Sequence, residues 1–428
     1  MKVLIISHTS LNTHNNMGKT LSTLFSSFDR SELCQLYIYP MMPDVDQCDS
    51  YYRVTDKDVL KGLLTLRVNG REIGAGEIDT GSHVLFENPQ DQGLYRNPKN
   101  KTALRVLLRD LMWTLSPWYS SQLKDWVVRQ KPTCIFVAPG VPKLLYDIAM
   151  RISSDFNLPI VTYICDDFYS VEPGNGLLEK LKQKLLVRKT EELFSKTAHL
   201  VAICDEIAEK YHVRFHVDTT TIMSGASFPV ADGPVFRQSP QVMTYMGNIR
   251  YNRYLCLAEI GEALDEINRE LGTDYQLHIY TIESNPEILA AFDGIVSVKL
   301  CGFVSGEEYD RVFRESEILI HTEAFDAHSM SLTQNSVSTK IADCLASGIS
   351  LFAYGPATIA SMAHLIRNDC AIIVTDRNKL RDTIKKVFID SDFRYSKIQS
   401  SIMAATRFHK KDYQSKKLRD ILCEVSST

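Results

Sequence analysis

The chain repeats one pattern: a short run of apolar residues, a turn, and then a longer segment that is apolar along one side only. The runs lie at residues 2–7, 33–39, 133–138, 160–165 and 200–204, and again at 242–246, 275–281, 318–321 and 349–354. Runs without alternating polar residues are typical of parallel strands that helices cover on both faces. The pattern therefore predicts an α/β protein with doubly wound parallel sheets.

Residues 227–241 interrupt this pattern. They contain three prolines and one glycine and show no regular period, as linkers do. We therefore predict two Rossmann-like domains, residues 1–226 and 242–409, that face each other across a cleft and are joined by a linker at 227–241. Residues 68–100 are polar and are expected to be irregular or a small hairpin insertion. In such sheets ligands bind at the carboxyl ends of the strands.

The composition excludes several classes of protein. Of the 428 residues, 44% are hydrophobic and 23% are charged, which suits a globular chain with sizeable cores. The formal net charge of −4 argues against a chain-wide basic surface for nucleic acid. The ten cysteines form no Cys-x-x-Cys pair, so neither a zinc site nor a disulfide framework is expected. The first apolar run is too short for a signal peptide, and we expect a soluble cytoplasmic protein.

Two segments after strands of the first domain carry candidate chemistry. Gly18 precedes a lysine and a threonine as in a phosphate-binding P-loop, but that loop needs a glycine where Thr13 stands. Gly18 could still place helix N–H groups near a phosphate or sugar, or lie in an ordinary turn. Asp166 and Asp167 follow another strand, where they could bind sugar hydroxyls, hold a metal or cap a turn.

The second domain opens with a glycine and two arginines. Gly247 follows the first strand, and Arg250 and Arg253 lead into the next helix. A glycine lets a ligand approach the backbone, and guanidinium groups match phosphate oxygens. The segment therefore suits a diphosphate, although a solvated helix start is the alternative.

A second segment of this domain carries hydroxyl and charged groups at the predicted start of a helix. Ser338, Thr339 and Lys340 stand together there, and Asp343 follows one helical turn after the lysine. Hydroxyl groups and an ammonium group can bind an anion, and a carboxylate beside them can hold two ribose hydroxyls. The alternative is a capped helix with exposed charges.

With these segments the chain resembles the GT-B glycosyltransferases, and within them the large retaining group that builds bacterial capsule, O-antigen and exopolysaccharide. The likeness extends over nearly the whole chain and is strongest over residues 242–375. Two positions depart from the family pattern. The family's Glu-x7-Glu signature falls on Asn335 and Asp343, and Asn248 stands where a basic residue is expected after Gly247.

The resemblance implies a role for each candidate residue. Arg253, with Arg250 as the open alternative, and Lys340 would neutralise the leaving diphosphate and serve as catalytic residues. The other implied roles are phosphate binding by Ser338 and Thr339, ribose binding by Asp343, contact with the base near Phe303, approach of Gly18 to the donor sugar, and contact of Asp166 or Asp167 with the sugar or the acceptor. No metal and no cofactor beyond the nucleotide sugar are implied.

The implied function is transfer of a sugar from a nucleotide diphosphate to a glycan or lipid-linked glycan acceptor, with retention, in surface polysaccharide biosynthesis. Family frequency favours a UDP-sugar over a GDP-sugar. The final helix, within residues 410–428, is expected to pack back on the first domain. The alternatives are a non-catalytic GT-B-fold partner, a glycan-binding protein, or a nucleotide-sugar epimerase.

Two segments raise the question of membrane contact at the inner face of the plasma membrane. Residues 177–189 place leucines along one helical stripe, with lysines and arginines around it. Residues 101–109 are a second basic segment, which leads into Trp113, Trp118 and Trp126, the three tryptophans of the chain. Basic amphipathic helices with interfacial aromatic residues favour anionic membranes, whereas an ordinary helix covering a sheet and core tryptophans are the alternative.

Overall fold

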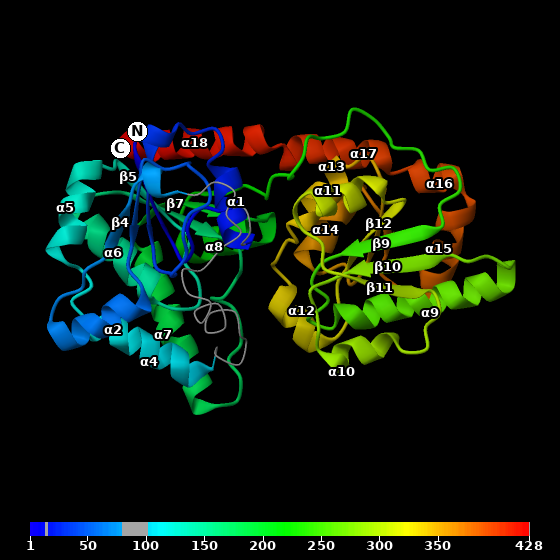
Figure 1. Cartoon of the computed structure of the whole chain (residues 1–428), viewed down its shortest axis with the longest axis horizontal. Coiled ribbons are helices and arrows are strands. Elements are labelled where there is room, and N and C mark those ends of the chain that lie inside the picture. The colour runs from blue at the N-terminus through cyan, green and yellow to red at the C-terminus, as the bar shows by residue number, and fades with distance from the viewer. Residues whose placement is uncertain (13–15, 79–101, 428) are drawn as a thin grey trace. The chain divides into compact units, whose positions relative to one another are not determined.

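The computed structural model describes residues 1–12, 16–78 and 102–427. The chain divides into two compact units, which we call unit 1 (Met1–Ser224 with Lys411–Thr428) and unit 2 (Gly225–Lys410) (Figure 1). The segment 227–241, predicted to be a linker, belongs to unit 2. Within it the N–H groups of Ala231 and Val235 each donate to a carbonyl oxygen of unit 2 at 2.8 Å. Its prolines prevent regular structure but leave such isolated hydrogen bonds available.

Unit 1 contains an eight-stranded sheet in the order β4-β3-β2-β1-β5-β6-β7-β8. Only the β3–β4 pair is antiparallel. The strands are β1 (Val3–Ser7), β2 (Leu33–Tyr37), β3 (Ser50–Arg53), β4 (Arg71–Ile73), β5 (Cys134–Val137), β6 (Ile160–Ile164), β7 (Thr197–Ala202) and β8 (Thr219–Thr221). The helices described are α1 (Asn16–Leu24), α2 (Asp56–Thr65), α4 (Ala103–Leu115), α5 (Ser121–Gln130), α6 (Leu144–Phe156), α7 (Leu177–Phe194), α8 (Asp205–Phe215) and α18 (Lys411–Ser427).

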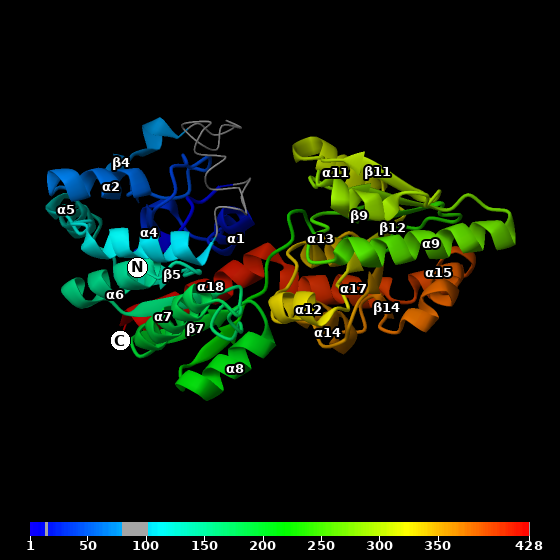
Figure 2. The same cartoon turned by 90° about the horizontal axis from the view of Figure 1, so that it is seen from below.

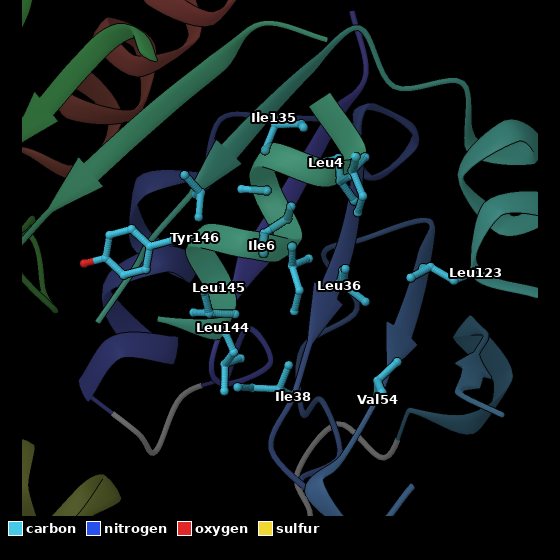
Figure 3. Close-up of a cluster of buried hydrophobic side chains, with 14 of the residues drawn as sticks. Leu4, Ile6, Leu36, Ile38, Val54, Leu123, Ile135, Leu144, Leu145 and Tyr146 are labelled. Carbon is cyan, nitrogen blue, oxygen red and sulfur yellow. The ribbon is translucent and has the colours of Figure 1, made fainter. Parts of the chain in front are cut away.

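The sheet of unit 1 buries both of its faces. Leu4 and Ile6 of β1 belong to one core cluster, together with Tyr146 of α6 (Figure 3). Val3 and Ile5, which point to the other face, belong to a second cluster that includes Leu418 of α18. The unbroken apolar composition of β1 follows from this double burial. The last helix of the chain thus completes the core of unit 1.

Unit 2 contains a six-stranded, wholly parallel sheet in the order β11-β10-β9-β12-β13-β14. The strands are β9 (Val242–Met246), β10 (Gln276–Tyr280), β11 (Val298–Gly302), β12 (Ile318–Thr322), β13 (Ser350–Tyr354) and β14 (Ile372–Val374). The helices are α9 (Arg253–Leu271), α10 (Pro286–Leu289), α11 (Gly306–Glu315), α12 (Ala327–Thr333), α13 (Lys340–Ala346), α14 (Ala360–Arg367), α15 (Leu380–Ile389), α16 (Ser391–Tyr395) and α17 (Ile398–Ala404). The predicted fold class, two α/β units with doubly wound parallel sheets, is confirmed.

Strand β3 shows where the apolar-run rule failed. Its ends, Ser50 and Arg53, are polar, yet both side chains are buried. Ser50 Oγ accepts a hydrogen bond from Trp126 Nε1 at 2.9 Å, and Arg53 Nη1 donates to the Met41 carbonyl at 3.2 Å. Because hydrogen bonds satisfy these groups, a polar strand can lie inside the unit.

The tryptophans are not surface residues, so they give no support to membrane contact. Trp113 and Trp126 are 2% and 0% exposed, and Trp118 packs against the core of unit 1. Trp113 Nε1 donates to Asp56 at 2.7 Å. None of the helices in the described ranges is both long and apolar enough to cross a membrane.

Candidate functional site

The site lies in unit 2, at the carboxyl ends of β9 and β12. The strand order changes direction here, because β9 pairs with β10 on one side and with β12 on the other. Gly247 directly follows β9, and Glu323 directly follows β12. Such a switch point is where doubly wound sheets bind ligands.

Lys340 extends its ammonium group to the backbone of Gly247. A Cβ atom added to Gly247, which has a φ of +156°, would lie 1.8 Å from Lys340 Nζ. Within the described residues, the ammonium group makes no hydrogen bond or ion pair. Burial and then the neighbouring charge of Arg253 lower the pKa of Lys340 to about 8. A partly buried ammonium group beside a second cation provides a place for an anion.

Arg253, the first residue of α9, is held by the buried carboxylate of Glu323. Its Nε and Nη2 atoms donate to Glu323 Oε2 at 3.1 and 2.9 Å. The Glu323 side chain is only 2% exposed, and His321 Nε2 lies 3.3 Å from its Oε1 atom. Burial raises the pKa of Glu323, but the hydrogen bond with His321 and the charge of Arg253 bring it below its ordinary value. The ionised carboxylate therefore orients the guanidinium group.

A small cavity of about 50 Å³ lies beside these groups. Lys340 and Arg253 line it together with Ser338, Asn248 and Thr244. Two cations and several polar groups thus meet in one enclosed space at the carboxyl end of β9.

Arg250 is engaged elsewhere. Its Nε atom donates to Glu283 Oε2 at 2.7 Å, and its side chain does not line the cavity that Arg253 and Lys340 share. The structure therefore brings Arg253, rather than Arg250, together with Lys340.

Asp343 lies inside unit 2 and is 4% exposed. Its Oδ1 atom accepts a hydrogen bond from the Ser227 N–H at 2.6 Å, and its Oδ2 atom accepts from Ser227 Oγ at 3.1 Å. Tyr309 Oη lies 3.5 Å from the same Oδ2 atom. Sequence reasoning missed Ser227 and Tyr309 because both are far from Asp343 along the chain. The carboxylate thus holds residue 227 against α13.

The other predicted residues of unit 2 lie on the outside. Thr339 is exposed and does not line the cavity. Phe303 is exposed just after β11. Neither side chain lines the cavity that Lys340 and Arg253 share.

In unit 1, Gly18 is a packing position. A Cβ atom there would lie 2.1 Å from Asn12 Nδ2, so any larger residue would displace Asn12. The position of Thr13, where the P-loop comparison failed, lies outside the described residues.

Asp166 and Asp167 also lie in unit 1, after β6. Asp167 accepts hydrogen bonds from Lys210 Nζ at 2.8 Å and from Tyr211 Oη at 3.0 Å. Burial raises its pKa, but the hydrogen bond and charge of Lys210 outweigh this and leave it below its ordinary value. Asp166 is half-buried, and Cys165 Sγ lies 3.8 Å from its Oδ2 atom. In the part of the chain that the structure describes, no three His, Cys, Asp or Glu side chains are grouped to hold a metal ion.

Glu323 and His321 are the main site residues that were not predicted. Glu323 comes two positions after the apolar run 318–321, close to where a ligand-binding residue of such a sheet would lie. Its position after this predicted strand could have identified Glu323 as a candidate. The sequence alone could not show that its partner is Arg253.

Comparison with known proteins gives the fold. No protein-family model and no curated protein matches the chain. Among solved structures, the Anabaena HepE protein in complex with UDP matches at a TM-score of 0.63 and 9% identity, over 99% of this chain and 100% of its own. Sucrose-phosphate synthase from Thermosynechococcus elongatus matches at 0.60 and 11% identity over 100% of both chains. An α,α-trehalose 6-phosphate synthase from Burkholderia multivorans matches at 0.57 and 9% identity, over 100% of this chain and 97% of its own. The chain therefore has the GT-B fold of two Rossmann-like domains.

Proposed function

We propose that the chain is a glycosyltransferase that moves a sugar from a nucleotide diphosphate to a glycan or lipid-linked glycan acceptor. The observation that carries the proposal is the Lys340 ammonium group, which lies over Gly247 and beside Arg253. One carboxylate, Glu323, is bound to Arg253, and the ammonium group remains for an anion. A diphosphate has the charge and the oxygen spacing to bind both cations.

The chemistry follows from this placement. When the bond between the donor sugar and the diphosphate breaks, negative charge develops on the leaving phosphate oxygen. The acceptor oxygen forms the new bond to the sugar, and its proton passes to the leaving phosphate oxygen. Lys340 and Arg253, whose guanidinium group Glu323 holds, are oriented before the reaction. They therefore stabilise the developing charge without reorganisation. Ser338 lines the same cavity and is proposed to donate to a phosphate oxygen.

The finer assignments are supported by the neighbours and by position. HepE was solved with UDP, which favours a UDP-sugar donor here. Phe303 is proposed to contact the base. Asp343 is proposed to bind the ribose, in which case ribose hydroxyls replace the hydrogen bonds from Ser227. Retention, a role in surface polysaccharide synthesis and a cytoplasmic location complete the proposal.

Incubation with a panel of UDP- and GDP-sugars and candidate acceptors tests the proposal. Release of nucleoside diphosphate with glycosylated acceptor is expected. An isomerised donor would indicate an epimerase, and no turnover with any donor would favour a non-catalytic partner. Lys340→Met should abolish most of the release. The matched control is Lys379→Met, an exposed lysine elsewhere in unit 2.

A further inference from the structure

Helix α4 of unit 1 is apolar on both of its sides. Its exposed side carries Leu104, Leu108, Leu111 and Leu115, which are 51 to 66% exposed. Its inner side buries Trp113 and also Asp110, whose Oδ1 atom has no hydrogen-bond partner among the described residues. A helix on a globular surface normally places its leucines inward only. The exposed leucines indicate that the outer side of α4 meets something apolar.

Two neighbouring helices extend this apolar surface. On α2 and directly after it, Leu60, Leu64 and Leu66 are exposed, Leu64 by 84%. At the start of α7, Leu177 and its neighbours Leu178 and Leu181 are exposed, Leu177 by 85%. The remaining leucines that the sequence placed on the same stripe, Leu185 and Leu186, turn inward.

These three helices pack side by side. α4 contacts both α2 and α7, and all three line the lower border of unit 1 in Figure 1 and face the viewer together in Figure 2. Asp56 at the start of α2 accepts hydrogen bonds from Arg109 Nε at 2.9 Å and Trp113 Nε1 at 2.7 Å, both on α4. We call the exposed leucines of α2, α4 and α7, with Leu66, the leucine face. Partly buried hydrogen bonds join α2 to α4, and α7 packs against α4.

Basic residues surround the leucine face, together with Glu179 of α7, which forms an ion pair with Lys182. The exposed side of α2 carries Lys57 and Lys61 in the same stripe as its leucines, and α7 exposes Lys180 and Lys184. On α4, Arg105 is the exposed charged residue among the leucines. Leucines surrounded by lysine and arginine match a bilayer whose headgroups are negative and whose interior is apolar.

We propose that the leucine face docks unit 1 on an anionic lipid bilayer. The leucine side chains enter the boundary between headgroups and acyl chains, and the lysines contact lipid phosphates. The inference concerns unit 1 alone and does not depend on the proposed transfer reaction in unit 2. A second copy of the chain on the same surface is the competing occupant, but its own leucine face would bring the same positive charges together.

Co-sedimentation with vesicles tests the proposal. The protein should pellet with vesicles of phosphatidylcholine and phosphatidylglycerol and remain in solution with phosphatidylcholine alone. High salt should release it, because exposed charges are screened. Equal pelleting with both kinds of vesicle, or none with either, would overturn the proposal.

Matched variants locate the contact. Leu108→Glu with Leu111→Glu should weaken binding to anionic vesicles on the order of tenfold or more, since two apolar side chains leave the lipid. The control is Val213→Glu, a 67% exposed residue on α8, which should bind as the unchanged protein does. Unaltered binding of the double variant would overturn the assignment. Melting temperatures check that the variants are folded.

A second pair of substitutions tests the charge without altering the leucines. Lys61→Gln with Lys184→Gln should reduce binding to anionic vesicles severalfold, and no change would contradict the role of the basic residues. Light scattering after gel filtration identifies the competing occupant. A dimer that Leu108→Glu with Leu111→Glu separates, in a protein that binds no vesicles, would show an interface between copies instead.

Discussion

Charged residues near the ends of two strands, β6 in unit 1 and β9 in unit 2, differ in whether a group of opposite charge pairs with them. After β6 in unit 1, Asp167 is matched by Lys210 and Tyr211. After β9 in unit 2, Lys340 lies beside Arg253 and has no anionic partner of its own among the described residues. The pKa of Asp167 is lowered toward the charged form, whereas the pKa of Lys340 is lowered toward the neutral form.

A charge with an ion-pair partner in its own unit stabilises the fold, whereas a charge without such a partner can bind a ligand. Asp167 gains from its ionised state in the folded protein, because its partners lie in the same unit. Lys340 is held in an unfavourable environment that an anion would relieve. Perturbed groups of the second kind concentrate at functional sites. The comparison therefore favours unit 2 as the donor side and gives Asp167 a structural role.

The strongest test removes the ammonium group. Lys340→Met should reduce turnover by ~10²–10³-fold, as loss of an oriented charge-stabilising group does. The melting temperature should stay the same or rise, because a desolvated charge is removed. Steady-state kinetics and thermal unfolding measure the two effects. Turnover close to that of the unchanged protein would contradict the proposed role of Lys340.

The corresponding test in unit 1 should change stability. Asp167→Asn should lower the free energy of unfolding by about 1–3 kcal/mol, because the Lys210 ammonium loses a charged acceptor. The folded-state pKa of Asp167 lies below its unfolded value, so its contribution is present above pH ~4 and is lost as the pH falls further. Denaturant titrations at neutral and acidic pH should show the difference between the two proteins shrinking in acid. A constant difference would rule out the ion pair as its source.

The pH dependence of ligand binding gives a second test of the role of Lys340. Lys340 has a pKa of about 8 in the free protein, and a diphosphate should bind its protonated form. The affinity for UDP should therefore fall as the pH rises above 8, by up to about tenfold per unit. Calorimetry in buffers of different ionisation enthalpy should detect proton uptake on binding near pH 8. In Lys340→Met this proton uptake should disappear.

The smallest effect is expected at Arg250. Its ion pair with Glu283 is on the surface of unit 2 and half-exposed on the arginine side, and such pairs contribute about 0–1 kcal/mol. Arg250→Ala should therefore change turnover only slightly, whereas Arg253→Ala should reduce it strongly. Equal losses in the two variants would show that both arginines meet the diphosphate.

Much of the fold could be predicted because the burial of a helix or strand determines how its apolar residues are spaced along the chain. β9 has the bounds that the sequence predicted, Val242–Met246. Strand β3 was missed. It is buried with polar ends, so it does not show the apolar run that a buried strand usually has.

The amino-acid sequence alone shows which residue types follow the strands: Gly247, Arg253 and Lys340 in unit 2, and Asp167 in unit 1. How these residues pair could be seen only in the folded chain. There Arg253 pairs with Glu323, Arg250 with Glu283 and Asp343 with Ser227, and Lys340 lies beside Gly247 with no anionic partner among the described residues. The physical reason is that periodicity reports how one segment is buried, whereas charge pairing depends on which strands become neighbours. In unit 2 the order β10-β9-β12 brings Arg250 to Glu283 and Arg253 to Glu323, which are 33 and 70 positions apart along the chain.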